Sequence, residues 1–126
     1  HYDHAEYRAL LARSRGLLFL CEHETQGMAY QEALASGVPI LAWDQGEWLD
    51  PLRLRFGDAA IPASSVPWFS PECGERFRDL PGFAPALDAF LLRLDRYRPR
   101  AYAAESLSLE RSADLYLEKY GPLAPE

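Results

Sequence analysis

The chain has 126 residues, of which 48% are hydrophobic and 25% are charged, so it has the composition of one small globular domain or of part of a larger one. A formal net charge of -6 argues against binding of nucleic acid or an anionic membrane by bulk charge, although it leaves room for a local basic site. The apolar runs 17–21 and 38–43 are too short to span a bilayer, and the first residues given do not have the basic-then-apolar pattern of a secretion signal. With only Cys21 and Cys73, we expect two reduced thiols in a cytoplasmic protein rather than a disulfide framework.

The first part of the chain predicts a helix, a strand, a helix and a strand in that order. Asp3 and Glu6 have the spacing of a capping box at the start of a helix that ends near residues 14–16. Residues 17–21 predict a strand buried on both faces of a parallel sheet. A helix over 28–36 and a strand over 38–43 follow. This order favours right-handed crossovers, a parallel sheet and a Rossmann-like α/β fold.

The second part of the chain predicts less regular structure. Residues 48–56 are expected to be partly helical from Pro51 onward, and residues 59–61 form a weak candidate for a third strand. Because 62–85 contains five prolines, we expect an irregular segment that wraps the surface. Helices are then expected over 84–97, over 100–106 and after Ser108. We therefore treat the chain as a single partial domain, with a core over 1–62 and a proline-rich segment and C-terminal helices over 63–126.

Four arginines cluster at the end of the helix expected over 84–97: Arg93, Arg96, Arg98 and Arg100. Arginines in a last helical turn interact favourably with the helix dipole, so they can simply stabilise the end of the helix. A contact with phosphate or with a partner is the alternative interpretation.

Residues 21–41 contain two carboxylates eight positions apart, Glu24 and Glu32, on either side of Gly27. Glu24 follows the carboxyl end of a predicted parallel strand, which is where ligands bind in open α/β sheets. The first backbone N–H groups of the next helix come from Gln26, Gly27 and Met28, and such groups favour a phosphate oxygen. Gly27 lets a ligand approach the backbone closely.

The two carboxylates suit hydroxyl groups rather than phosphate. Glu32 lies four residues beyond Met28, on the same helix face and one turn deeper. One carboxylate can accept hydrogen bonds from both hydroxyls of a vicinal diol, as in a ribose, and Glu24 can do the same for a hexose. We therefore expect both side chains to converge, beside Gly27, on one nucleotide-diphospho-sugar. The alternative is that Glu24 only interacts with the helix dipole and Glu32 is a solvated helix residue.

Other chemistry has weaker support in the sequence. Cys21, His23 and Glu24 have no second cluster that would complete a metal site, so no metal is expected. Neither a Gly-x-x-x-x-Gly-Lys nor a Gly-x-Gly-x-x-Gly motif occurs. We interpret His23 as a loop histidine that contacts solvent or phosphate, and Cys73 as structural.

Glu24, Gly27 and Glu32, followed by Ala33-Leu34-Ala35-Ser36-Gly37-Val38-Pro39-Ile40, resemble the donor-site signature of the GT-B glycosyltransferases of family four. The stretch 107–111 with Tyr120 resembles the closing helix of those enzymes. The resemblance implies that the chain is the back portion of a C-terminal, donor-binding domain. It also implies that Glu24 holds the donor sugar at the catalytic centre, that Glu32 holds the ribose, and that the backbone from Gln26 through Met28 to Ala29 faces the sugar and diphosphate. Members of that family retain anomeric configuration and usually need neither metal nor cofactor.

Several features depart from that signature. Cys21 stands where the family has serine, and Thr25 and Gln26 stand where it has Gly-Phe, so we expect Gln26 to change sugar selection. By this resemblance, we expect the basic pair that neutralises the diphosphate and the acceptor-binding N-terminal domain to belong to a segment before His1. We therefore expect the 126-residue chain to be inactive alone and to expose an apolar sheet edge that permits self-association.

The sequence thus predicts the donor-binding portion of a retaining, hexosyltransferase-type glycosyltransferase with an unknown acceptor. Two alternatives remain open: a nucleotide-sugar epimerase of the same fold, and a non-catalytic nucleotide-sugar binding or interaction module.

Overall fold

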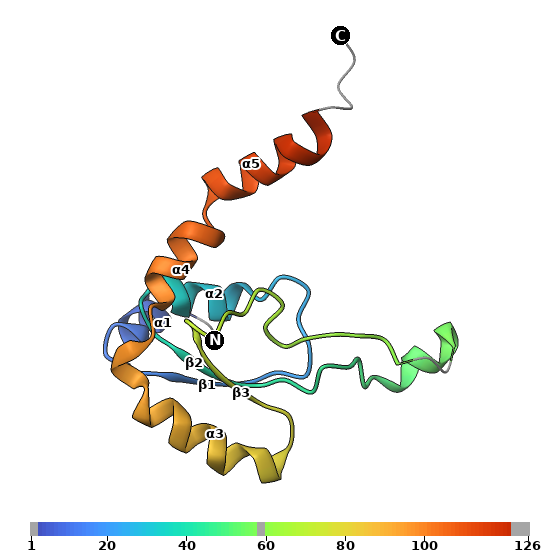
Figure 1. The fold of residues 1–126 in the computed structure, drawn as a ribbon, viewed down its shortest axis with the longest axis horizontal. Coiled ribbons are helices and arrows are strands. Elements are labelled where there is room, and N and C mark those ends of the chain that lie inside the picture. Colours follow the sequence, from blue (N-terminus) through green and yellow to red (C-terminus); the bar gives the residue numbers. More distant parts are fainter. Residues whose placement is uncertain (1–2, 58–59, 122–126) are drawn as a thin grey trace.

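The chain forms an α/β fold with a three-stranded parallel sheet, and helices flank both faces of the sheet (Figure 1). The computed structural model describes residues 3–57 and 60–121. The strands are β1 (Leu17–Leu20), β2 (Ile40–Trp43) and β3 (Gly74–Phe77), and they lie in the order β1-β2-β3. This architecture is compatible with the predicted Rossmann-like fold.

The predicted order of the first four elements is confirmed. Helix α1 (His4–Leu11) begins after Asp3, whose side chain accepts hydrogen bonds from the backbone N–H groups of Ala5 and Glu6. Helix α2 (Met28–Ala35) follows β1, and β2 pairs with β1 in parallel, with Leu17 opposite Ile40.

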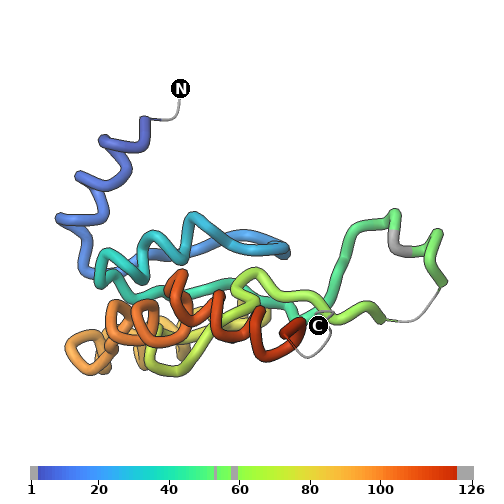
Figure 2. Tube along the Cα trace, turned by 90° about the horizontal axis from the view of Figure 1, so that it is seen from above, coloured from blue at the N-terminus to red at the C-terminus, as the bar shows by residue number. Residues whose placement is uncertain are grey.

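The main core lies between the sheet and the helices α1, α2 and α4 (Pro99–Ser106). Alternate residues of a strand point to opposite faces, so Ile40 and Ala42 of β2 face this core. The fully buried residues Tyr30 and Leu34 of α2 pack against them. Helix α3 (Leu80–Leu92) covers the other face, where it packs against β2 and β3. Figure 2 shows the fold from above, with α1 projecting at one end and the segment around η1 (Pro51–Phe56) at the other.

The prediction that the first strand is buried on both faces is wrong. Leu18 is 47% exposed and Leu20 is 64% exposed, whereas Leu17 and Phe19 pack against the core. The reason is that β1 lies at the edge of the sheet and α3 covers β2 and β3 instead. An apolar strip of β1 and the neighbouring Leu91 of α3, which is 56% exposed, is therefore left open.

The third strand also differs from the prediction. Ala60 and Ile61 belong to no strand, and Ala59 lies outside the described residues. The third strand is β3, inside the segment that was expected to be irregular. Because β3 is an edge strand, the polar residues Glu75 and Arg76 are tolerated in it. These residues interrupt the run of apolar residues from which a buried strand would be predicted.

Helix α3 begins four residues earlier than predicted, because Asp79 caps it by accepting a hydrogen bond from Gly82 N–H at 2.9 Å. A short 3-10 turn, η2 (Leu94–Arg96), follows, and then α4, as expected. Ser108 caps the last helix, α5 (Leu109–Tyr120), as predicted. Every residue of α5 is exposed, and Figure 1 shows this helix extending away from the body of the domain.

Residues 46–57 and 60–63 form an arm that leaves the carboxyl edge of the sheet and returns to it (Figure 1). The two limbs are joined by hydrogen bonds from Trp48 N–H to the Ile61 carbonyl at 2.8 Å and from Ala63 N–H to the Gly46 carbonyl at 3.3 Å. The expected helical turn is the 3-10 helix η1 (Pro51–Phe56) at its tip.

Among the described helices, none is both long and apolar enough to cross a membrane.

Candidate functional site

The candidate site lies at the carboxyl edge of the sheet, where the loops after β1 and β2 meet the base of the arm. In parallel sheets this edge is where ligands bind. The loop 21–27 is held against the returning chain by a hydrogen bond from Glu24 N–H to the Ser64 carbonyl at 2.9 Å. Residues 40 positions apart in the sequence thus form one surface.

Gly27 gives the start of α2 its shape. Its backbone is left-handed, with φ 77°, and no side chain caps the helix there. The first helical hydrogen bond runs from Gln31 N–H to the Gly27 carbonyl at 3.1 Å. The N–H groups of Met28, Ala29 and Tyr30 therefore have no partner within the helix, which is the arrangement that favours an anion.

Glu24 lines a hollow of about 690 Å³ between the loop after β1 and the base of the arm. The hollow is lined by His23, Glu24, Thr25, Trp48, Ile61, Pro62, Ala63, Ser64 and Pro67. The ring of Trp48 meets His23 edge-on, with centroids 6.3 Å apart. A carboxylate beside an aromatic ring in a hollow of this size suits a hydroxylated ring, because the carboxylate accepts from hydroxyls and the indole covers C–H groups.

Asp44, directly after β2, holds the wall of this hollow in place. Its carboxylate accepts hydrogen bonds from the Ser64 hydroxyl at 2.9 Å, from Ser65 N–H at 3.2 Å and from the Arg76 guanidinium at 3.1 Å. Only 5% of the Asp44 side chain is exposed. A buried carboxylate with three donors is a fixed structural element, and through Ser64 it also fixes the loop that carries Glu24.

Glu32 lines a different hollow, of about 440 Å³, between α2 and the α4–α5 junction. Met28, Gln31 and Arg100 line it as well. The Glu32 carboxylate lies 3.4 Å from His4 Nε2, and 36% of the side chain is exposed. Glu32 is therefore accessible, but it shares no hollow with Glu24. The start of α2 lies between the two hollows along the chain.

The remaining candidate residues surround the helix start in different ways. The Gln26 carbonyl accepts a hydrogen bond from Gln31 Nε2 at 2.7 Å, and Gln26 lines a third hollow that also includes Trp68. Met28 is 68% exposed. The Ala29 carbonyl accepts a hydrogen bond from the Tyr7 hydroxyl at 2.8 Å, which ties α2 to α1.

The cysteines have no sign of nucleophilic activation. Both are free thiols. Burial, and next the Glu24 carboxylate, raise the pKa of Cys21, and burial raises the pKa of Cys73 to about 11. A thiol whose pKa is raised is a poor source of thiolate. In the part of the chain that the structure describes, no group of three or more His, Cys, Asp or Glu side chains is arranged to hold a metal ion.

Three residues of the site were not selected from the sequence: Asp44, Trp48 and Ser64. Asp44 could have been selected from the sequence, because it is an acid placed directly after the carboxyl end of a predicted buried strand. Trp48 and Ser64 could not, because their place in the site depends on how the arm folds back. His23 was interpreted as a loop residue; its Nδ1 atom is buried and, among the described residues, has no hydrogen-bond partner.

Comparisons of the chain with protein-family models, with curated proteins and with solved structures gave no match.

Proposed function

We propose that the chain is the donor-binding portion of a retaining glycosyltransferase of the GT-B type, which transfers a hexose from a nucleotide-diphospho-sugar to an acceptor. The observation that carries the proposal is that the uncapped α2 start at Gly27 lies, along the chain, between Glu24 and Glu32, each of which lines a hollow. An extended ligand with a sugar at each end and a diphosphate in the middle has the matching order of groups.

The separation of the two hollows refines how the donor is held. The hexose occupies the hollow of Glu24 and Trp48, and the ribose lies near Glu32, one helical turn or about 6 Å farther along α2. The diphosphate lies over the N–H groups at the start of α2. These groups stabilise the negative charge that develops on the diphosphate as the bond to the sugar breaks.

In this proposal Glu24 is the catalytic-site residue, and it orients the sugar by accepting from its hydroxyls. Arg100 lines the hollow of Glu32, but its guanidinium is engaged by the Ala35 and Ser36 carbonyls at the far end of α2. We therefore assign the cations that neutralise the diphosphate, together with the acceptor site, to an N-terminal domain. The open apolar strip of Leu18 and Leu20 is consistent with such a neighbour. Two free thiols fit a cytoplasmic enzyme.

Titration calorimetry with nucleoside diphosphates and with the corresponding nucleotide-sugars tests the proposal. Glu32→Gln should weaken binding of both ligands about tenfold, because a charged hydrogen-bond acceptor contributes about 1.5 kcal/mol. Glu24→Gln should weaken only the nucleotide-sugar. Glu22→Gln, which changes an exposed carboxylate in the same loop, is the matched control and should leave both affinities unchanged.

If Glu24→Gln and Glu32→Gln weaken the bare nucleoside diphosphate equally, the assignment of the two hollows is wrong. If no nucleoside diphosphate or nucleotide-sugar binds the unmodified chain, the donor site itself is wrong.

A further inference from the structure

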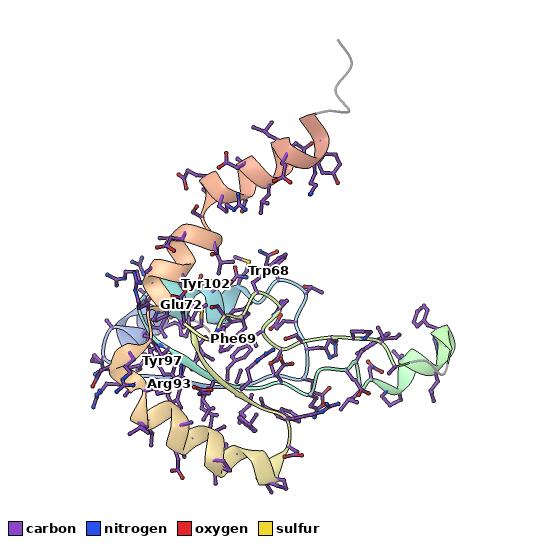
Figure 3. The ribbon with its side chains drawn as sticks, viewed as in Figure 1. Trp68, Phe69, Glu72, Arg93, Tyr97 and Tyr102 are labelled. Carbon is purple, nitrogen blue, oxygen red and sulfur yellow. The ribbon has the colours of Figure 1, made fainter. Side chains whose placement is uncertain are left out.

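The edge of the sheet opposite the candidate site is strongly basic. We call it the basic edge and define it by the arginines at the ends of α1 and α3, in the segments that lead into β1 and α4, and in the first turn of α4: Arg8, Arg13, Arg15, Arg93, Arg96, Arg98 and Arg100. These are seven of the 13 basic residues of a chain whose net charge is -6. Figure 3 labels Arg93 at this end of the molecule, and the arm protrudes from the other end.

Only some of these charges are neutralised locally. Arg93 forms an ion pair with Glu75. Arg15 lies 3.3 Å from Asp95, but the two side chains are 76% and 91% exposed, so this ion pair is weak. Four further arginines of the basic edge are Arg8, Arg13, Arg96 and Arg98. In the described part of the chain, no ion pair or side-chain hydrogen bond engages their guanidinium groups.

The helix-dipole interpretation explains only part of the cluster. Arg100 donates hydrogen bonds to the Ala35 and Ser36 carbonyls, at 3.2 and 3.1 Å, and so caps the end of α2. Arg96 and Arg98 lie at the end of η2 and just after it, and a three-residue 3-10 turn has no comparable dipole. Their positive charge is therefore not required by a neighbouring helix end.

Exposed leucines accompany the unpaired arginines. Leu10 is 49% exposed in the last turn of α1, and its carbonyl accepts a hydrogen bond from Arg13 N–H. Leu92 is 84% exposed at the last residue of α3. An acidic protein partner would need only the positive charges. Arginines interspersed with exposed leucines match a membrane surface instead, because it has phosphate groups at its outer level and acyl chains beneath them.

We propose that the basic edge binds the surface of a bilayer that contains anionic phospholipids. The guanidinium groups of Arg8, Arg13, Arg96 and Arg98 contact lipid phosphates, and Leu10 and Leu92 enter the interface. At physiological ionic strength salt screens charges that lie more than about 8 Å from the bilayer, so acids far from the basic edge oppose binding little. Asp95, which lies at the basic edge, is paired with Arg15. In this orientation the hollow of Glu24, at the opposite edge of the sheet, faces away from the membrane. The proposal does not depend on the proposed donor site.

Sedimentation of the chain with vesicles tests this proposal. Vesicles of phosphatidylcholine alone are compared with vesicles that also contain phosphatidylglycerol, at low and at high salt. The triple variant Arg13→Gln, Arg96→Gln and Arg98→Gln removes three unpaired charges from the basic edge. The triple variant Arg55→Gln, Arg111→Gln and Lys119→Gln removes three charges from the arm and from α5, so it is the control with the same net charge. Circular dichroism melting curves verify that both variants are folded.

The unmodified chain should bind the anionic vesicles at low salt, and high salt should release it. Each arginine removed from the basic edge should lower the partition coefficient about fivefold. The control variant should bind like the unmodified chain. Absence of binding to anionic vesicles overturns the proposal, and so does equal loss of binding in the two variants. Binding to soluble polyglutamate without binding to anionic vesicles also overturns it, in favour of an acidic protein partner.

Discussion

Gly27 approaches the ring of Tyr30 so closely that a Cβ atom at residue 27 would lie 1.9 Å from Tyr30 Cε1. Tyr30 is fully buried, and its hydroxyl accepts a hydrogen bond from Trp68 N–H at 3.2 Å. The ring therefore cannot move aside without disturbing the core. The start of α2, and with it the candidate anion site, is fixed by a core contact as well as by the left-handed backbone of Gly27.

Gly27→Ala should lower the free energy of unfolding by about 2–5 kcal/mol. A left-handed backbone costs a non-glycine residue about 1–2 kcal/mol, and overpacking against Tyr30 adds about 1–3 kcal/mol. Gly46→Ala is the matched control, because Gly46 has a similar φ of 81° but nothing within 4 Å of an added Cβ. It should lose only the backbone part, and urea denaturation measures both. Equal losses in the two variants would show that the Tyr30 contact contributes nothing.

Asp44→Ala should lower the free energy of unfolding by about 2–4 kcal/mol, because the Ser64 hydroxyl, Ser65 N–H and Arg76 lose their common acceptor. Glu47→Ala is the control, since Glu47 pairs with Arg78, which is 70% exposed. An exposed pair of this kind contributes less than about 1 kcal/mol.

Asp44→Ala also tests the coupling to the site. Ser64 should become mobile and release Glu24 N–H from its carbonyl, so hydrogen exchange over residues 22–26 should become faster. If exchange there stays at the rate of the unmodified chain while stability falls, Asp44 supports the core but does not position the Glu24 loop.

The parts of the fold that depend on neighbouring residues were predictable. The cap at Asp3 and the sequence from β1 through α2 to β2 depend on capping, periodicity and the Gly37-Val38-Pro39 break, and all of these act within a few residues. The position of Glu24 after a parallel strand followed from the same local order.

The remaining features depend on contacts between distant segments. The strand β3 has a half-polar sequence that becomes a strand only because β2 provides a pairing edge, with Ile40 opposite Gly74. The burial of β1 on one face only depends on which strands α3 covers. The separation of Glu24 from Glu32 depends on the arm and on the α4–α5 junction, and each of these forms the wall of one hollow.

Alkaline pH should destabilise the protein between about pH 9 and pH 11. Burial raises the pKa of Cys73 from 9.0 to about 11, and burial also raises the pKa values of Tyr30, Tyr97 and Tyr102. A group whose pKa is higher in the folded state contributes stability that is fully present below its unfolded pKa and is lost as the pH rises toward the folded value. The urea midpoint should therefore fall across this range.

Cys73→Ala measures how much of the loss of stability at alkaline pH comes from the Cys73 thiol. The variant should be less stable at neutral pH, since Cys73 is fully buried, but its stability should fall less steeply between about pH 9 and pH 11. Cys21 and the tyrosines, whose pKa values are also raised by burial, remain and keep a residual slope. Identical slopes in the variant and in the unmodified chain would mean that Cys73 does not titrate on unfolding in this range.

The two capped helices α3 and α5 should respond differently when their caps are removed. Ser108 accepts a hydrogen bond from Arg111 N–H at 3.2 Å, and Asp79 accepts one from Gly82 N–H at 2.9 Å. Loss of either cap removes about 1 kcal/mol from its helix. Every residue of α5 is exposed, whereas α3 packs on β3, where Phe83 meets Phe77 with ring centroids 5.1 Å apart.

Ser108→Ala should therefore speed hydrogen exchange within α5 severalfold and leave the melting temperature of the domain unchanged, because unfolding of α5 exposes almost no core. Asp79→Ala should lower the melting temperature by about 3–6 °C, since α3 cannot loosen without uncovering β2 and β3. Hydrogen exchange with calorimetry on the same samples distinguishes the two responses. A drop in melting temperature for Ser108→Ala as large as that for Asp79→Ala would show that α5 packs against the domain in solution.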